Sequence, residues 1–455
     1  MKKLHGVHVP HRKNTAGRAP ERMPVPPAIT LPMNMHIGAP AKPVVSVGDE
    51  VLVGSLVAEA GGFVSSPVYS GVSGKVKKID EILTSAGKKV PAVIIETDGL
   101  QRPIDYVPPT VTDTKSFLEA VRMSGVVGLG GAGFPTAVKL SVKDLNQIET
   151  VVINGAECEP YITSDTRTML DQPELVLKGI ELLQKHLSAK RIIFAIEDNK
   201  PDCLKLYREK TKGISGVEVQ SLPAMYPQGG EKVLIYHTTG RMVPEGGLPI
   251  DAGAVVINCT TLAALARYIT TGVPLFEKCV TVDGSAVREP KNVIVPIGTP
   301  MQAVFDFCGG FKEEPKKVLY GGPMMGIAVP DTAQPVLKTT NALLAFAEKD
   351  AVLPETTACI RCGTCIRTCP LNLMPVEIEH AYNMQDGARL KKLKVNLCME
   401  CGCCAYVCPA HRSLVQVNKL AKATLAGYNA EQKAEAERAA ARAAAKSEAK
   451  EAEKK

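Results

Sequence analysis

Eight of the 14 cysteines form two copies of one spacing near the C-terminal end of the sequence. Each copy reads Cys-x2-Cys-x2-Cys-x3-Cys-Pro, and the two runs start at Cys359 and Cys398. This spacing is typical of paired four-iron clusters, in which three cysteines of a run bind one cluster and the fourth binds the other. The crossed rule predicts two ligand sets: Cys359, Cys362, Cys365 and Cys408 for one cluster, and Cys369, Cys398, Cys401 and Cys404 for the second.

Structural zinc is the weaker interpretation of these cysteines. Zinc sites typically use two Cys pairs separated by a loop of about 12 to 20 residues, not two complete quartets that each end in Pro. Cys403 is left over. Two adjacent one-electron centres form a relay, so a second cofactor must supply or accept the electrons. A flavin is the usual converter between the electron pair of a nicotinamide and single-electron clusters.

A second candidate for chemistry is the glycine-rich stretch at residues 128–136, GLGGAGFPT. The backbone amides of such a loop can approach phosphates without obstruction, and Lys139 can add a positive charge. Taken alone, the loop is about as well explained by a tight turn as by a nucleotide site.

The segments around the glycine-rich loop predict an α/β layer. From Ser116 to about Gly272, apolar strands at 151–154, 191–197 and 254–258 alternate with helical patterns. Strands separated by helices indicate a mainly parallel sheet, and such sheets bind ligands at the C-terminal ends of their strands. Several Gly-rich or polar turns follow these strands directly.

The flanking segments predict β-rich domains and a polar tail. Residues 44–97 combine β-branched runs with turn signals and resemble lipoyl- and biotinyl-type domains, but 60–67 contains no Lys, so a docking or structural role is expected. Residues 278–330 indicate a small β-rich domain with one helix. Residues 429–455 are nearly all Ala, Glu, Lys and Arg, which predicts an exposed helix or a frayed tail.

Composition limits the remaining classes of function. A chain of 455 residues exceeds one core and predicts roughly three or four domains. No apolar run reaches about 18 residues and no signal peptide is recognisable, so we expect a protein of the reducing cytosol that does not itself span a membrane. The net charge of +7 is partly concentrated before Pro43 and is interpreted as a solvated basic arm, not a nucleic-acid site. His5, His8 and His11 are expected to be surface histidines.

The sequence resembles the flavin- and NADH-binding subunit of respiratory complex I at four places. GLGGAGFPTAVKL is followed by VVINGAECEPY, and YPQGGEK and VVINCTTL come later. Two departures are Leu129, where that family has Arg, and Ala156, where it commonly has Asp. The resemblance implies FMN and nucleotide contacts by Gly128, Gly130, Gly131, Gly133, Phe134, Lys139, Asn154, Glu157, Gly230, Glu231, Asn258 and Thr261.

Across almost its whole length the chain is similar to the C subunit of the Rnf complex, an ion-translocating ferredoxin:NAD oxidoreductase. The order of segments carries this resemblance, as do the phrases HIGAPAKPVVSVGDEV and NGAECEPYITSDTRTM. The implied function is exchange of electrons between NAD(H), FMN and two [4Fe-4S] clusters, with an iron–sulfur subunit and membrane-embedded subunits as partners and ferredoxin as an indirect partner. The implied location is the cytoplasmic face of the cell membrane.

The expected fold class is multidomain α/β and α+β. Its expected parts are a basic Pro-rich arm (1–43), a lipoyl-like β-sandwich of the barrel-sandwich hybrid type (44–100), an FMN/NADH-binding α/β domain (101–277), a β-grasp domain of SLBB type (278–335), a two-cluster ferredoxin-type domain (336–425) and a helical or disordered tail (426–455).

Two rival functions stay open at the level of the sequence. One is a soluble NADH-dependent flavoprotein reductase similar to cobalamin reductases, although that family begins with the flavin domain. The other is a non-catalytic iron–sulfur adaptor whose flavin site is vestigial. In that case Glu157 and Glu231 are ordinary loop acids, Phe134 is a core aromatic, and Asn258 and Thr261 only cap a helix.

Overall fold

A computed structural model describes residues 4–85 and 87–452, with side chains described as far as residue 443. The described chain forms two compact units. The first spans His8–Leu353, and the second contains Pro354 onward together with a short N-terminal stretch that ends at Val7.

The N-terminal part of the first unit is a β-domain with two small sheets. One has the strand order β2 (Ala28–Pro32), β8 (Lys89–Thr97), β7 (Gly74–Leu83) and β4 (Glu50–Val51), and the other contains β3 (Lys42–Pro43), β5 (Leu56–Glu59) and β6 (Val68–Tyr69). Alternate residues such as Ile29, Leu31, Val93 and Ile95 point into one core, as expected for strands with one buried face.

The segment predicted to be an arm pairs with strands of more than one sheet. Strand β2 pairs with β8 in antiparallel register, from Ala28↔Glu96 to Pro32↔Ala92, and Met33 and Met35 are buried. Strand β1 (Glu21–Arg22) pairs with β14 (Lys291–Pro296), which lies about 270 residues later in the chain. Pairing partners outside residues 1–43 therefore hold part of this segment in place.

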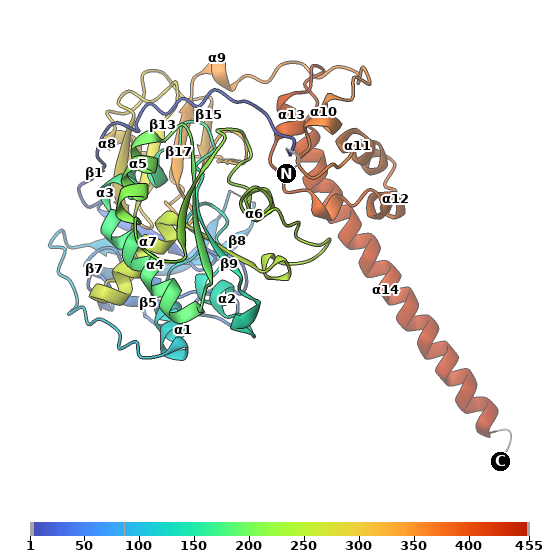
Figure 1. The fold of residues 1–455 in the computed structure, drawn as a ribbon, viewed down its shortest axis with the longest axis horizontal. Helices are drawn as coiled ribbons and strands as arrows, with labels where there is room; N and C mark the ends of the chain where they lie inside the picture. The colour runs from blue at the N-terminus through green and yellow to red at the C-terminus, as the bar shows by residue number, and fades with distance from the viewer. Residues whose placement is uncertain (1–3, 86, 453–455) are drawn as a thin grey trace. The chain divides into compact units, whose positions relative to one another are not determined.

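The middle of the first unit is a four-stranded parallel sheet, in the order β11 (Val217–Leu222), β10 (Arg191–Glu197), β9 (Thr150–Gly155) and β12 (Ala254–Asn258). Figure 1 shows helices on both faces of this sheet. Val151 and Ile153 pack against helices that include α4 (Pro173–Leu187) and α7 (Cys259–Thr271), whereas Val152 packs against α6 (Glu231–Thr239). The remaining helices of this layer are α1 (Thr114–Met123), α2 (Thr136–Leu140), α3 (Ser164–Asp171) and α5 (Pro201–Lys210).

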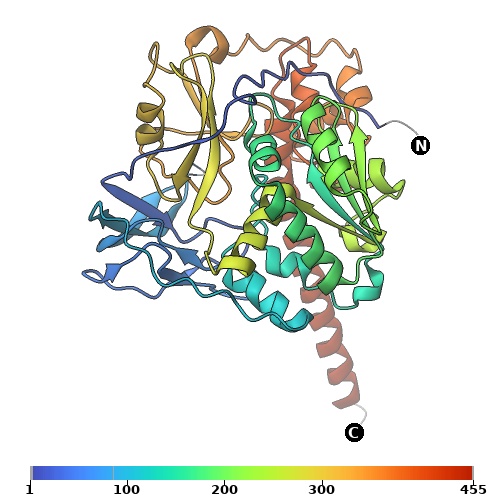
Figure 2. The ribbon, with the colours of Figure 1, turned by 60° about the vertical axis from the view of Figure 1, so that its left-hand side comes forward.

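A six-stranded sheet completes the first unit (Figure 2). Its order is β1, β14, β13 (Glu277–Asp283), β17 (Ala342–Phe346), β15 (Lys317–Tyr320) and β16 (Ile327–Ala328), and α8 (Met301–Phe307) packs on it through Val304 and Phe305. Strand β17 pairs with both β13 and β15. The second compact unit begins at Pro354, just after α9 (Glu348–Ala351), whereas the sequence placed the start of the two-cluster domain at residue 336.

A fully buried lysine ties the β-domain to the layers around it. The ammonium of Lys338 donates hydrogen bonds to the carbonyl oxygens of Pro67 (2.5 Å) and Gly125 (2.7 Å) and to the hydroxyl of Ser66 (3.2 Å). Three acceptors satisfy the three donors of an ammonium, which makes its burial tolerable.

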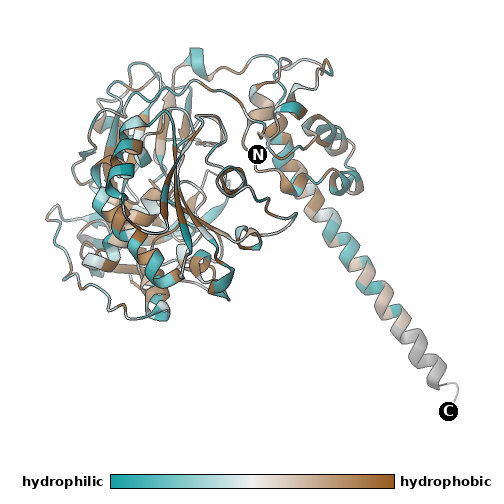
Figure 3. Cartoon of the chain, viewed as in Figure 1, coloured by the Kyte–Doolittle hydropathy of each residue, from teal (hydrophilic) through white to brown (hydrophobic). Residues whose placement is uncertain are grey.

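The second unit is helical. Helices α10 (Thr364–Thr368), α11 (Pro375–Asn383), α12 (Gly387–Lys392) and α13 (Cys403–Tyr406) precede the long helix α14 (Leu414–Ala452). Ile378, Leu390 and Leu425 form its core, so α14 is anchored by its first turns before the polar tail begins. Figure 3 shows teal and light-brown residues mixed along the later part of α14. Among the described helices, none is long and apolar enough to cross a bilayer.

Candidate functional site

The glycine-rich loop precedes α2 and exposes its backbone. Gly128 N–H donates to the carbonyl of Phe134 (2.9 Å), and Gly133 N–H donates back to the carbonyl of Gly128 (3.0 Å), which closes the loop. Between these bonds, Gly130 and Gly131 are exposed, and Phe134 is half-buried. Gly131 (φ 110°) and Gly133 (φ 65°) occupy the left-handed region that glycine adopts most readily. The loop therefore offers open peptide groups to a ligand.

The end of strand β12 holds this loop. The amide of Leu129 donates to Thr261 Oγ1 (2.9 Å), and a Cβ built on Gly130 would lie 3.1 Å from Asn258 Nδ2. Asn258 Oδ1 also accepts the amide of Thr261 (3.0 Å) and thereby caps α7. Asn258 and Thr261 thus have the capping role that the sequence left open, and they also lie directly against the loop.

Two further contacts join neighbouring strand ends and turns. Lys139 Nζ donates to Glu231 Oε1 (2.7 Å) and to the carbonyl of Val256 (3.2 Å). Asn154, at the end of β9, donates from Nδ2 to the carbonyl of Gly229 (3.0 Å), and the next residue, Gly230, is the N-cap of α6. The structure thus gathers the predicted residues at the C-terminal edge of the parallel sheet, where such sheets bind ligands.

Glu157 lies beside this edge but is fully engaged by protein groups. Its carboxylate accepts the amide of Asp165 (2.7 Å) and the hydroxyl of Thr166 (2.7 Å), both in the first turn of α3. Burial raises the pKa of Glu157, and Lys13 opposes that increase. The position of this carboxylate is therefore set by α3 and by Lys13.

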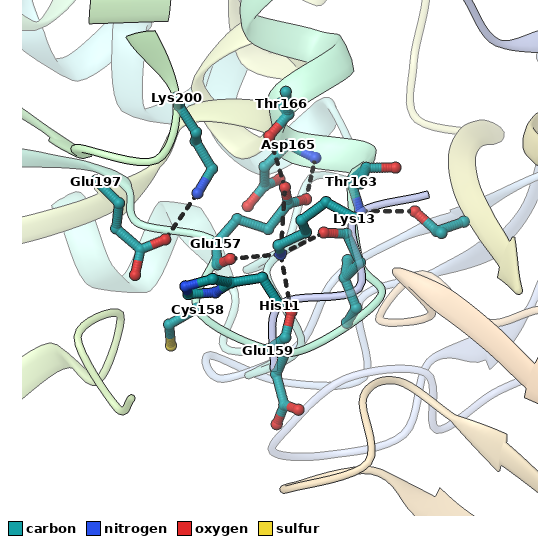
Figure 4. A network of polar contacts seen from close by, with 12 residues as sticks. His11, Lys13, Glu157, Cys158, Glu159, Thr163, Asp165, Thr166, Glu197 and Lys200 are labelled. Carbon is teal, nitrogen blue, oxygen red and sulfur yellow. Dashed lines mark hydrogen bonds and ion pairs between the residues drawn. The ribbon is translucent and has the colours of Figure 1, made fainter. Parts of the chain in front are cut away.

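Lys13 is a site residue that the sequence did not indicate. Its ammonium donates to the carbonyl oxygens of Glu157 (2.7 Å), Glu159 (2.8 Å) and Ile162 (2.6 Å), as Figure 4 illustrates for the surrounding network. The side chain of Lys13 is only 17% exposed. The expectation of a solvated basic arm is therefore wrong for Lys13, and no local pattern distinguishes it from Lys2 or Lys3.

Glu159 connects the same segment to the six-stranded sheet. Its carboxylate accepts the amides of Met324 (3.1 Å) and Met325 (2.8 Å), in the turn before β16. A Cβ built on Gly322 would lie 2.1 Å from Glu159 Oε2 and 2.8 Å from Glu159 Cβ, so a larger residue there would displace the Glu159 side chain. Glu159 lies within the motif NGAECEPY. The two glutamates on either side of Cys158 are the sequence feature that could have marked it as a site residue.

A Glu159→Gln variant tests the buried state of this carboxylate. Burial raises the pKa of Glu159 to about 7, although the amides of Met324 and Met325 lower it. The unfolded value is about 4.3, so the folded protein retains a proton between about pH 4.3 and pH 7 that the unfolded chain has released. The contribution of Glu159 to the free energy of unfolding therefore falls as the pH rises through this window.

The variant, which cannot titrate at this position, should lose less stability than the wild type between about pH 5 and pH 7.5. Urea unfolding at several pH values measures this difference. An Asp49→Asn variant, changed at an exposed carboxylate of the same unit, should keep the wild-type slope. Identical slopes for all three proteins would contradict a buried, protonatable Glu159.

In the second unit the cysteines gather in two sets. Burial raises the pKa of Cys365, and the neighbouring thiols of Cys408 and Cys359 raise it further. Burial also raises the pKa of Cys369, to which Cys401 and Cys398 add. The fourth cysteine of each run therefore lies among the first three of the other run. Cys362 is exposed.

The second set borders a cavity. Apolar side chains, among them Leu371, Leu373 and Val415, line this cavity. Cysteines that include Cys369 and Cys398 also line it. Asn418 Nδ2 donates to the sulfur of Cys398 (3.4 Å), and the amide of Leu373 donates to that of Cys369 (3.4 Å). Thiolates with N–H donors in a largely apolar pocket are the donor set of an iron–sulfur cluster.

Among the described residues, no three His, Cys, Asp or Glu side chains converge closely enough to hold a single metal ion. A four-iron cluster binds its cysteines at separate iron atoms, so its ligand sulfurs are spread more widely than those of one ion. Buried Cys403 interacts with Cys401 beside the cavity.

Four family models match successive parts of the chain. They are described as RnfC Barrel sandwich hybrid domain (residues 2–100), Nuo51 FMN-binding domain (121–267), SLBB domain (279–328) and 4Fe-4S dicluster domain (351–417). These matches confirm the predicted fold class.

Curated relatives align over most of the chain. The C subunit of the proton-translocating ferredoxin:NAD(+) oxidoreductase complex of Clostridium ljungdahlii is 41% identical over 81% of this chain and 82% of the relative. The C subunit of the Na(+)-translocating ferredoxin:NAD(+) oxidoreductase complex of Acetobacterium woodii is 42% identical over 82% of this chain and 85% of the relative. The C subunit of the ion-translocating oxidoreductase complex of Rhodobacter capsulatus is 37% identical over 85% of this chain and 76% of the relative.

A solved structure shares the fold. A chain of the NAD+-reducing [NiFe]-hydrogenase in the H2-reduced state superposes with a TM-score of 0.52 and 19% identity. The alignment covers 69% of this chain and 63% of that chain.

Proposed function

Because the chain belongs to the family of C subunits of ion-translocating ferredoxin:NAD oxidoreductase complexes, we propose that it carries electrons between NAD(H), FMN and two [4Fe-4S] clusters. This family membership confirms the resemblance drawn from the sequence, and it favours a role within such a complex over the soluble reductase. The observation that carries the proposal is the presence, in one chain, of a match to an FMN-binding domain and a match to a dicluster domain.

The flavin site proposed here lies at the C-terminal edge of the parallel sheet. The exposed amides of Gly130 and Gly131 would face the phosphate, and Lys139 would add charge from α2. Asn154 and Glu231 would orient the flavin, because both are already held by neighbouring groups. When bound, FMN exchanges a hydride with the nicotinamide and single electrons with the clusters. No side chain is required as a general base.

The cluster ligands proposed here are the two crossed cysteine sets. Supporting this, the thiol of Cys408 lies near Cys365, and Cys369 lies near Cys398 and Cys401. The division into domains proposed here follows the strand pairing: a β-domain up to about residue 100, the flavin-type layer, the six-stranded sheet through β17, and the cluster unit from Pro354.

The relatives are named as subunits of multi-subunit complexes. The partners proposed for this chain are an iron–sulfur subunit that receives the electrons and membrane-embedded subunits that move the ion, with ferredoxin reached indirectly. Through these subunits the chain would lie on the cytoplasmic face of the cell membrane. Co-sedimentation with membranes after gentle lysis, reversed when the partner subunits are deleted, tests this placement.

Anaerobic titration of the purified chain tests the function. NADH is expected to bleach the flavin absorbance first and the cluster absorbance afterwards, with about eight irons per chain. Denaturation should release FMN in an amount close to one per chain. Absence of both flavin and NADH-driven bleaching in a protein that retains its irons would leave only the adaptor function.

A further inference from the structure

A cavity of about 270 Å³ lies beside the proposed flavin site and shares helix α7 with it. Its walls come from α3, α7, β13 and the end of β14, and residues Pro20 and Arg22 of the N-terminal segment close one side. Of the glycine-rich loop, only Leu129 reaches it, and Asn154, Glu157 and Glu231 do not line it. The cavity is therefore separate from the residues proposed to hold FMN.

Positive charge dominates the cavity wall. Arg22 and Arg267 share one carboxylate, Glu277, at 2.5 Å and 3.0 Å, and this carboxylate is itself 90% buried. One acid between two guanidinium groups leaves one net positive charge, on side chains that are 60% (Arg22) and 39% (Arg267) exposed. Arg167 is neutralised by Asp171, to which it donates from both Nε and Nη2.

Lys278 is a further basic group on the cavity wall. It is 95% buried on β13, and its ammonium donates to the carbonyl of Lys338 (2.8 Å). An ammonium has three donors, and within the described part of the chain no carboxylate forms an ion pair with it. Burial lowers the pKa of Lys278 to about 7, while Asp165 opposes the decrease. Near neutral pH the amine is therefore only partly protonated, and an anion bound beside it would favour its charged form.

We propose that this cavity binds a small phosphate-bearing anion, held by Lys278 and the guanidinium of Arg267. The net positive charge of Arg22, Arg267 and Glu277, together with the proton that a bound anion would favour on Lys278, complements a phosphate dianion, and a guanidinium presents paired N–H donors to its oxygens. A cavity of about 270 Å³ has ample room for orthophosphate. The ligand is thus a compact phosphorylated molecule, of which orthophosphate is the simplest probe.

Calorimetric titration of the full chain, loaded with FMN and clusters under anaerobic conditions, tests the site with orthophosphate. Saturable 1:1 binding is expected, and Lys278→Met should weaken it at least tenfold. Ala264→Phe, which fills the cavity from α7 and leaves every charge in place, should weaken it by at least as much. Lys291→Met is the matched control, because Lys291 is buried on the adjacent strand outside the cavity and should change the affinity less than twofold.

Three results would overturn the proposal: no saturable binding of orthophosphate up to about 10 mM, binding that survives Ala264→Phe in a folded protein, or saturable binding of succinate where orthophosphate fails. Loss of NADH-driven bleaching would refute the proposed function and leave these binding results unaffected, because the cavity does not depend on the flavin.

Discussion

A Cys362→Ser/Cys408→Ser double variant is expected to retain about four of the about eight irons found in the wild-type chain. Both cysteines are expected to bind the same cluster, although they are far apart in the sequence, because the thiol of Cys408 lies beside those of Cys365 and Cys359. Ligation within each run would instead place the two residues on different clusters, and the double variant would then lose all its iron. Iron and sulfide analysis of oxygen-free protein measures the difference.

The matched control for this experiment is Cys403→Ser. Cys403 is buried beside the second cysteine set but belongs to neither quartet, so the variant should keep all of its about eight irons. A Cys408→Ser/Cys398→Ser variant should lose both clusters. Zinc in place of iron in the wild-type protein would contradict the cluster assignment altogether.

A Lys13→Met variant is expected to lose about 3 kcal/mol or more of its free energy of unfolding, because three carbonyl oxygens lose a charged donor. These carbonyls belong to the segment that begins at Glu157 and ends at Ile162. The same segment follows β9, whose end contributes Asn154 to the proposed flavin site. We therefore also expect FMN to bind at least about tenfold more weakly, which corresponds to about 1.4 kcal/mol.

Urea unfolding measures the first effect, and recovery of flavin fluorescence on dilution measures the second. Arg18→Met is the matched control, because it removes a charge from the same N-terminal stretch at an exposed position and should leave both quantities unchanged. A Lys13→Met protein with wild-type stability and FMN affinity would show that the segment is held by other contacts.

Local patterns predicted the chemistry of the chain well. The two cysteine runs predict a crossed arrangement, and the structure places Cys408 near Cys365 and Cys369 near Cys398. The strands of the parallel sheet were likewise predictable, since continuous apolar runs such as 151–153 indicate burial on both faces. Asn154 and Asn258 lie side by side at the ends of β9 and β12, because the carboxyl ends of parallel strands meet at one edge of the sheet.

Only the tertiary structure decided where the N-terminal segment belongs and what completes the site. Glu21 and Arg22 pair with a strand about 270 residues away, and Lys13 reaches the carbonyls of Glu157 and Ile162. A lone lysine among basic neighbours has no periodicity that marks it as buried, and a two-residue edge strand has no signature of its own. Such contacts depend on which distant surfaces the fold brings together. A ligand spacing or a strand, in contrast, can be recognised from residues that are close together in the sequence.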